Sequence, residues 1–466
     1  MSTTLINNAI TYAGIPIHDS TIGNPLFTTW MVDASDGLQS FDVLCYGDSN
    51  NQYTETGNEP LNGYIDGLAK GFELLGIPVY GSPIYWAGAE SRKYGLYFYS
   101  SYTATTQSGT VELGSADTDS SFATPKLDLA DPGGGEFSVS LGTGQDNWAK
   151  VETASQSNGR KIVGELAWPL AAQEVTGRWL YIRTSDSASA YNLLTIYSTG
   201  YQANVAKDLS GTLGYAVATQ VLPAGVRTGD LNMGYAGAGI GVNSNGKAGF
   251  VFNSMHTNTI GCCVSSIYSR GGANSTDYKN DITALYNHNS NKKLKIYLQE
   301  VVNRQLAANS NNTGRVAIFF HGGMNATAGA TATDQANTFV SDYKETARLL
   351  KETWISLGYK ESNLCFIFTF SHPFSTTQAG ESSFFKKTRE KLYEECAGIG
   401  LNALVVNHTT NLPAEQYVTQ ILWNGSENTA IASPEAHLAS PGYLAISKVI
   451  TSSLVNYFKG FIKQKK

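Results

Sequence analysis

The chain has 466 residues, of which 42% are hydrophobic and 15% charged, so it can bury a substantial core and is neither disordered nor a coiled coil. The formal net charge of −6 argues against nucleic acid or an anionic membrane as the main partner. No apolar run approaches the ~18 residues of a membrane span, and the start of the chain lacks the basic and apolar parts of a signal peptide. We therefore expect cytoplasmic synthesis of a chain that begins near Met1 and has no membrane partner.

Cysteine and histidine usage bears on compartment and cofactors. Five cysteines in a chain of this length are too few for a disulfide scaffold. Cys262 and Cys263 are adjacent within an apolar stretch, which predicts two buried strand residues rather than a redox or metal site. The seven histidines show no His-Glu-x-x-His spacing and the cysteines no Cys-x-x-Cys spacing, so we expect no metal and no other cofactor.

Strands and helices alternate in two parts of the chain. After a polar arm of about 35 residues, residues 41–46 read as a short buried strand, and apolar side chains at helical spacing predict a helix within 58–76. The alternation resumes near residue 260, where helical spacing recurs around 294–301, 339–354 and 444–454. Further strands are predicted at 260–268, 315–320, 363–370 and 402–407. This order predicts a parallel sheet with helices on both faces.

The middle of the chain has a different sequence pattern. Between about 90 and 257, short β-like runs are separated by turns of Gly, Asn, Asp and Ser, and no long helix is evident. We interpret this region as an all-β sandwich or jelly roll inserted into the α/β domain. The predicted division is an N-terminal arm at 1–35, an α/β domain made of 36–90 and 258–466, and a β insertion at 91–257, which would be a carbohydrate-binding module.

A serine follows the first predicted strand, in the run Gly47-Asp48-Ser49-Asn50. The end of a parallel strand lies at the carboxyl edge of the sheet, where open α/β folds bind their ligands. There a serine hydroxyl can reach a substrate, and the backbone N–H groups of the next turn can face a developing oxyanion. A Gly-Asp-Ser turn is nevertheless common, so this run needs support from other segments.

Three later segments supply that support. A glycine-rich loop, Arg270-Gly271-Gly272-Ala273-Asn274, follows the second strand. The third strand ends in Gly323-Met324-Asn325, which places an amide donor suited to an oxyanion at its tip. His437 lies in a loop immediately before the last predicted helix.

Taken in this order, the four segments resemble those of the SGNH hydrolase superfamily, the GDSL-type esterases and lipases. The resemblance covers about 41–90 and 258–460 and implies a flavodoxin-like three-layer fold with a parallel sheet. It implies that Ser49 is the nucleophile and His437 the general base. It further implies an oxyanion hole made of the N–H groups of Ser49 and Gly272 and the side chain of Asn325.

Two positions depart from the pattern of this family. Asn50 follows the serine where an apolar residue is usual. Pro434 stands three residues before the histidine, where the family places its acid, and proline cannot orient an imidazole through its side chain. Glu435 can replace the acid, or a backbone carbonyl can hold the imidazole in a Ser-His dyad, or the activity is impaired.

Four further residues are candidates for the pocket. Asp48 and Asn50 flank the serine, His321 lies at the end of the third strand, and His372 follows the fourth. The run His321-Gly322-Gly323 also resembles the oxyanion motif of α/β-hydrolase esterases. That fold requires a Gly-x-Ser-x-Gly elbow further along the chain, and none occurs after residue 323.

The expected function is hydrolysis of esters on O-acylated, above all O-acetylated, carbohydrate. The partner would be a polysaccharide or other glycan, and not a nucleic acid. The low charge, the β-rich insertion and the resemblance are also typical of a phage tail fibre, tailspike or other virion-associated deacetylase, which would bind virion proteins and form a homo-oligomer, a trimer in a fibre. The alternatives are a catalytically impaired virion structural or receptor-binding protein on the same scaffold, and a bacterial acyl-esterase or lipase.

Overall fold

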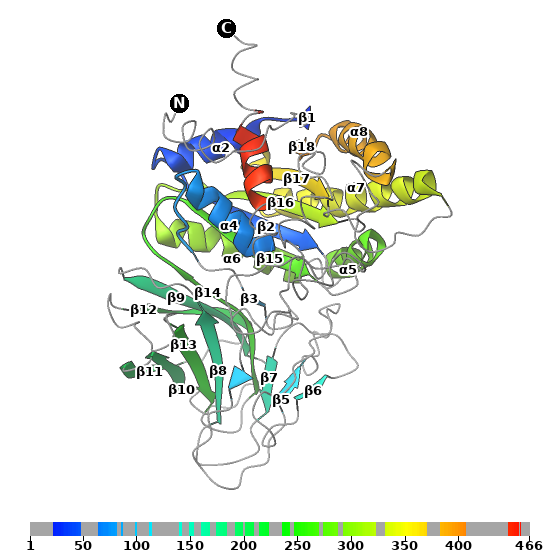
Figure 1. Cartoon of the computed structure of the whole chain (residues 1–466). Helices are drawn as coiled ribbons and strands as arrows, with labels where there is room; N and C mark the ends of the chain where they lie inside the picture. Colours follow the sequence, from blue (N-terminus) through cyan, green and yellow to red (C-terminus); the bar gives the residue numbers. More distant parts are fainter. Residues whose placement is uncertain are drawn as a thin grey trace, which may run out of the picture. The chain divides into compact units, whose positions relative to one another are not determined.

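The structure is a computed structural model. It describes residues 22–47, 64–81, 85–86, 98–99, 111–113, 139–141, 149–152, 160–167, 174–183, 192–198, 201–208, 214–222, 235–242, 247–269, 274–287, 292–322, 331–370, 383–406, 446–455 and 457. These fall into two compact units, one within Met1–Tyr80 and Asn258–Lys466 and the other within Gly81–Thr257 (Figure 1). We call them the α/β unit and the β unit.

The α/β unit is built on a six-stranded sheet. The spatial order is β1-β18-β17-β16-β2-β15, in which β1 pairs antiparallel with β18 and all other neighbours are parallel. The strands are β1 (Ile22–Gly23), β2 (Phe41–Gly47), β15 (Cys262–Ser269), β16 (Arg315–Gly322), β17 (Leu364–Phe370) and β18 (Ala403–Val405). The prediction of an α/β fold with a mostly parallel sheet is therefore confirmed.

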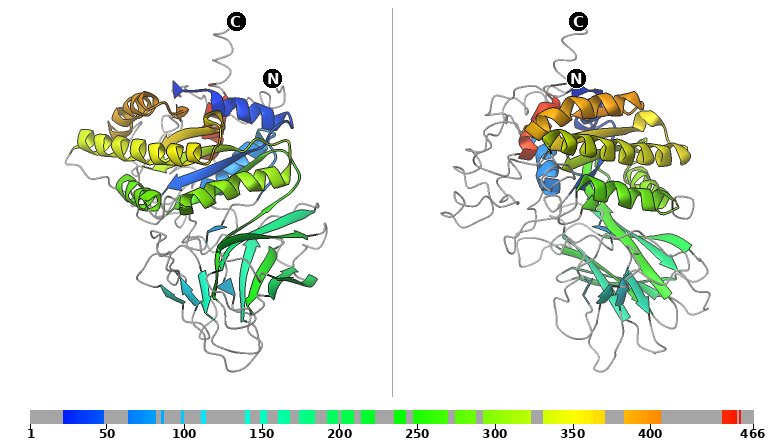
Figure 2. Two further views of the ribbon diagram at one scale, coloured as in Figure 1. Left: turned by 180° about the vertical axis from the view of Figure 1, so that it is seen from behind. Right: turned by 90° about the vertical axis from the view of Figure 1, so that its right-hand side faces the viewer.

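Helices cover both faces of this sheet (Figures 1 and 2). On one face lie α2 (Leu26–Ser35), α4 (Tyr64–Leu74) and the C-terminal helix at 446–455. The other helices are α5 (Ser275–Asn287), α6 (Lys292–Ala308), α7 (Ala332–Ser356) and α8 (Ser383–Gly398). Every residue of β2 and of β17 is buried, as expected for strands covered from both sides.

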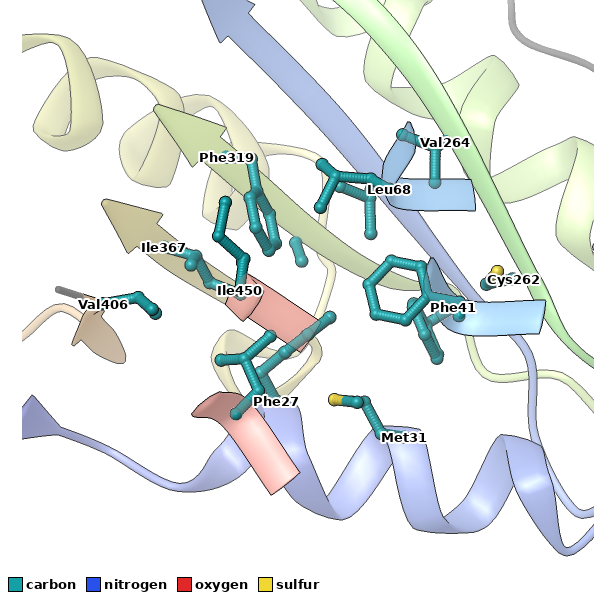
Figure 3. Packing of buried hydrophobic residues seen from close by; sticks show 14 of the residues in the cluster. Phe27, Met31, Phe41, Leu68, Cys262, Val264, Phe319, Ile367, Val406 and Ile450 are labelled. Atoms are coloured by element: carbon teal, nitrogen blue, oxygen red, sulfur yellow. The ribbon is translucent and has the colours of Figure 1, made fainter. Parts of the chain in front are cut away.

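Aromatic side chains pack together in the core between the sheet and the helices α2 and α4 (Figure 3). The ring of Phe27 on α2 meets Phe41 and Phe319 edge to face, with centroids 5.2 and 5.7 Å apart. Phe41 meets Phe72 on α4 in the same way at 5.6 Å. Residues 22–35, which the sequence analysis placed in an N-terminal arm, thus form β1 and α2, because Phe27, Trp30 and Met31 supply an apolar face to this core.

A buried ion pair lies near the amino ends of the strands. Arg304 on α6 donates to Asp42 on β2 over 3.0 Å, and both side chains are fully buried. Tyr80 donates its hydroxyl to the same carboxylate at 2.7 Å, and Gln305 donates to its second oxygen at 3.2 Å. Three donors thus contact the carboxylate, because a buried charge needs hydrogen-bond partners. We call these four residues the amino-edge cluster.

The described residues of the β unit are nearly all in strands. One sheet has the order β11-β10-β13-β8-β4 and the other the order β12-β9-β14-β7-β5-β6, with β3 paired to β14. The strands are β3 (Tyr85–Trp86), β4 (Phe98–Tyr99), β5 (Val111–Leu113), β6 (Val139–Leu141), β7 (Ala149–Glu152), β8 (Arg160–Ala167), β9 (Val175–Arg183), β10 (Asn192–Ser198), β11 (Tyr201–Asp208), β12 (Gly214–Leu222), β13 (Tyr235–Val242) and β14 (Lys247–His256). Apart from β5 with β6, their pairing is antiparallel.

The chain passes from one unit to the other twice, and the residues next to each crossing pair within their own unit. Within the α/β unit, Val79 forms a parallel bridge with Cys262, and Tyr80 donates its N–H to the carbonyl of Cys262. Within the β unit, Gly81 forms an antiparallel bridge with His256. In the described part of the chain, no helix has both the length and the apolar character needed to cross a bilayer.

Candidate functional site

Most of the predicted site lies outside the described residues. This applies to Asp48, Ser49, Asn50, Gly272, Asn325, His372, Glu435 and His437. Of the candidates, only His321 is described, together with strand and helix ends that precede or follow the others in the chain.

The loops that carry three predicted site residues leave the sheet along one edge. Ser269, the last residue of β15, pairs with Gly47, the last residue of β2. On the other side of β2, Tyr46 pairs with Phe320 of β16. The serine run, the glycine loop and the Gly-x-Asn run therefore begin at the carboxyl ends of three neighbouring strands.

The sheet order changes direction at this edge. Along the chain, β15 follows β2 and lies on one side of it, whereas β16, β17 and β18 continue on the other side. In open α/β sheets, ligands bind outside the carboxyl ends of the strands at such a reversal, because the outgoing loops diverge there. For this chain the reversal lies between β2 and its two neighbours, next to Gly47.

Three buried polar side chains meet at the same edge. Thr369 of β17 has its hydroxyl oxygen 3.0 Å from Nδ1 of His321 and 3.0 Å from the hydroxyl oxygen of Tyr64, the first residue of α4. The ring of Tyr64 stacks on the imidazole with centroids 3.9 Å apart. His321 and Thr369 are each 1% exposed, and Tyr64 is fully buried. We call this trio the carboxyl-edge cluster.

The electrostatics of this region favour neutral groups. Burial raises the pKa of Tyr64 well above its usual value, and the neighbouring Cys45 thiol acts in the same direction. Burial likewise raises the pKa of Cys45 itself, which faces the apolar core. A phenol that stays protonated can act as a hydrogen-bond donor at every pH of interest, so Tyr64 is a stable partner for Thr369.

The glycine at the end of β16 packs closely against side chains of α7. A β-carbon at Gly322 would lie 2.3 Å from the hydroxyl oxygen of Tyr343 on α7 and 3.5 Å from Phe339. The side chain of Tyr343 therefore occupies the space that a β-carbon at this strand end would need.

The loop that carries Gly272 is anchored where it enters α5. Asn274 accepts hydrogen bonds from the N–H groups of Thr276 and Asp277, while Asp277 accepts from the N–H of Asn274, which is a reciprocal helix cap. Asp342 of α7, 2% exposed, accepts from Ser275, Thr276 and Lys279. The first turn of α5 is thus tied to α7.

Sequence reasoning missed several of these residues. Tyr64 was assigned to the apolar face of a helix, and Thr369 lies within an apolar strand, so neither carries a recognisable motif. Asp342 occupies a buried position of an amphipathic helix, where a charged residue is itself a signal of a specific partner. His321 was predicted as a pocket residue, and that role stays a prediction.

Among the described residues, no group of three or more histidine, cysteine, aspartate or glutamate side chains is arranged to hold a metal ion. All five cysteines are buried and none forms a disulfide.

Comparisons with known proteins leave the family open. No protein-family model matches the chain, and no curated protein matches it. Among solved structures, an isomaltodextranase from Arthrobacter globiformis complexed with panose is 14% identical over 25% of this chain and 19% of its own, with a TM-score of 0.18. A family 35 carbohydrate-binding module from an environmental isolate is 18% identical over 26% of this chain and 80% of its own, also at 0.18.

A xylanase 10C from Cellvibrio japonicus in complex with xylopentaose is 9% identical over 54% of this chain and 59% of its own, with a TM-score of 0.17. The chain spans less than a fifth of the length of the isomaltodextranase that it matches. At these TM-scores, none of the similarities supports an argument about fold or function. What the site does must be argued from its own residues.

Proposed function

We propose that this protein is a serine ester hydrolase of the SGNH type that removes acyl groups from carbohydrate. Ser49 is the nucleophile, His437 the general base, and the N–H groups of Ser49 and Gly272 with the amide of Asn325 form the oxyanion hole. Asp48, Asn50 and His372 line the pocket, and no cofactor takes part.

The observation that carries this proposal is the register of the strand ends. Ser269 pairs with Gly47, and Phe320 with Tyr46, so the runs that contain Gly272, Ser49 and Asn325 start side by side. With the antiparallel edge strand β1 left aside, the five parallel strands, numbered along the chain, lie in the order 2-1-3-4-5, which is that of flavodoxin-like doubly wound sheets that bind ligands at this reversal. Both features are what the family resemblance requires.

The proposed chemistry is acyl transfer in two steps. The Ser49 oxygen attacks the ester carbonyl carbon while His437 takes the hydroxyl proton, and the imidazolium then gives that proton to the departing sugar hydroxyl. Water, deprotonated by His437, attacks the acyl-serine and releases the carboxylic acid and free serine. The three oxyanion donors stabilise the negative oxygen in both steps, by several kcal/mol where such donors have been tested (about 3–4 each).

The experiment compares turnover of p-nitrophenyl acetate by the wild type with Ser49→Ala and His437→Ala. We expect each variant to lose about 10³-fold or more in kcat, because nucleophile and base act as a unit. Ser310→Ala, an exposed serine at the opposite edge of the sheet, and His288→Ala are the matched controls and should keep wild-type turnover. Wild-type turnover no faster than that of Ser49→Ala would exclude the proposal.

The orienting group of His437 has its own test. If Glu435 holds the imidazole, Glu435→Gln lowers kcat by orders of magnitude while leaving KM nearly unchanged, because the group acts on the reacting base and not on substrate binding. An unchanged kcat would instead assign that role to a backbone carbonyl in a Ser-His dyad.

The substrate is proposed from the β unit. Its two sheets suit a β-sandwich inserted after the first strand and helix of the hydrolase, and we infer that it binds the glycan whose acyl groups the site removes. Release of acetate from an O-acetylated polysaccharide, measured against p-nitrophenyl esters of increasing chain length, distinguishes a carbohydrate deacetylase from a lipase. We propose a virion-associated protein, such as a phage tail fibre, as the setting.

A second function is favoured by one position. Pro434 occupies the place of the family acid, and loss of that acid can remove most catalysis while leaving binding intact. The chain would then be a virion structural or receptor-binding protein on the same scaffold. Glycan binding that is equal in the wild type and Ser49→Ala, without acetate release by either, would support this function.

A further inference from the structure

The carboxyl-edge cluster connects the start of α4 with the carboxyl ends of β16 and β17. Tyr64 is the first residue of α4, directly after the segment that contains Ser49. His321 precedes Gly322 at the end of β16, and Thr369 precedes Phe370 at the end of β17. The segments that follow these strands contain Asn325 and His372.

The contacts within the cluster define a direction for each hydrogen bond. A threonine hydroxyl has one proton to donate and two lone pairs to accept with. Thr369 lies 3.3 Å from the carbonyl oxygen of Phe320, which can only accept. Its proton goes to that carbonyl, so Thr369 accepts from both of its other neighbours.

This assignment settles the roles of the two remaining members. Tyr64 donates its hydroxyl proton to Thr369 over 3.0 Å. Nδ1 of His321 donates as well, also over 3.0 Å, so this nitrogen of the imidazole carries a proton. The stacked ring of Tyr64 holds the imidazole plane in place.

We propose that Tyr64, Thr369 and His321 are positioning residues for acyl transfer, which hold the start of α4 at a fixed separation from the carboxyl ends of β16 and β17. The inference rests on the proposed function, since it assigns these residues to the same site. Their effect is indirect: in the sequence, Ser49 lies on the segment before Tyr64 and Asn325 on the segment after His321. An oxyanion hole with one donor on each segment depends on that separation, because a displacement of about 1 Å can cost about 100-fold in rate.

The kinetic test removes single hydroxyl groups. We expect Thr369→Val and Tyr64→Phe to lower kcat for p-nitrophenyl acetate by about tenfold or more, with KM within about twofold, because the transition-state donors are displaced but substrate contacts are not. Thr369→Ser restores the hydroxyl and should recover most of the rate. Thr353→Val, which changes a buried threonine near the far end of α7, is the matched control and should keep wild-type kcat.

A spectroscopic test is independent of turnover. With ¹⁵N-labelled histidine, the imidazole nitrogens of His321, assigned by their absence in His321→Gln, should show a protonated Nδ1 in the wild type and lose that preference in Thr369→Val. Tyr64→Phe serves the same purpose if Thr369→Val does not fold.

The outcomes separate this inference from the proposed function. Wild-type kcat in both Thr369→Val and Tyr64→Phe, or an Nδ1 of His321 without a proton in the wild type, would overturn the inference while leaving the esterase in place. Absence of turnover in the wild type would end the proposed function, and the tautomer measurement would still decide the hydrogen-bond assignment.

Discussion

The two edges of the parallel sheet each bury a polar cluster, but the clusters differ in charge. The amino-edge cluster joins Asp42 to Arg304, with Tyr80 and Gln305 completing the hydrogen bonds of the carboxylate. The carboxyl-edge cluster contains a phenol, a hydroxyl and an imidazole. Each joins one helix to two or more segments of the sheet region, and each contains a fully buried tyrosine.

This difference in charge predicts which substitutions lower the stability of the protein most. Burial raises the pKa of Asp42 above that of an ordinary carboxyl, and the Arg304 guanidinium opposes that shift. Removing one member of such a pair leaves a charge in the interior, which costs far more than the pair contributes. In the carboxyl-edge cluster, removing one hydroxyl leaves a hydrogen-bond partner unsatisfied but removes no counter-charge. We therefore expect substitutions in the amino-edge cluster to lower the free energy of unfolding more than substitutions in the carboxyl-edge cluster.

The largest expected effect is at the amino edge. Arg304→Met should lower the free energy of unfolding by about 3–5 kcal/mol, because Asp42 remains buried without its counter-charge. The measurement is urea denaturation followed by circular dichroism. Asp42→Leu combined with Arg304→Met should recover much of the loss, and a double variant no more stable than Arg304→Met would contradict the electrostatic explanation.

The next effect is steric and lies at the carboxyl edge. Gly322→Ala should destabilise by about 1–3 kcal/mol, because its β-carbon would overlap the hydroxyl of Tyr343. Adding Tyr343→Phe removes that atom and should restore part of the loss in a double-mutant cycle. Gly398→Ala, where a β-carbon would meet nothing within 4 Å, is the control. Equal stability of Gly322→Ala and the wild type would show that α7 can move away from the strand.

The two buried tyrosines compare the edges directly. Tyr80→Phe removes a hydrogen bond to a charged group and should cost about 1.5–3 kcal/mol, whereas Tyr64→Phe removes a neutral one and should cost about 0.5–1.5 kcal/mol. Urea denaturation of the two variants side by side measures the difference. A larger loss in Tyr64→Phe would reverse the ranking of the edges proposed here.

The smallest effect concerns an exposed pair and depends on pH. The hydrogen bond from Lys344 lowers the pKa of Glu395, which lies on α8 opposite α7. A lowered pKa contributes stability above the unfolded-state pKa of about 4.3, and that stability is lost as the pH falls through the folded-state value. With both side chains more than a third exposed, the contribution is at most about 1 kcal/mol. The stability difference between the wild type and Glu395→Gln should therefore shrink from pH 7 to pH 3; a constant difference would mean that the charge does not matter.

Much of the α/β unit follows from the sequence. Buried runs such as 315–320 and 363–370 are strands because they are apolar throughout, and helical spacing located α4, α6 and α7. The helix α2 was missed although its start carries a signal, since Asn24 accepts a hydrogen bond from the N–H of Leu26 and Pro25 precedes the first turn. Periodicity reports which residues are buried but not which partner covers them.

For the candidate site, the sequence predicts only a series of motifs and their order along the chain. The sequence places Ser49, Gly272 and Asn325 after predicted strands, and pairing adds that the strands are neighbours in the right register. Side-chain partners were beyond sequence reasoning: nothing local indicates that Asp342 would meet Ser275, or Tyr64 meet Thr369, because these contacts join residues far apart in the chain. The roles of Ser49, Glu435 and His437 stay predictions.

The bridge between Gly81 and His256 has a consequence for the order of folding. Strands β2 and β15 are neighbours in the sheet, and Phe41 pairs with Cys262. The whole β unit lies between these two residues in the sequence, so their pairing closes a long loop. For a flexible chain, the entropy of closing such a loop grows by about 0.6 kcal/mol for each doubling of its length. If the β unit folds first, its own ends are already together, and the closure becomes that of a short loop. Early folding of the middle of the chain would thus accelerate assembly of the sheet that carries the site.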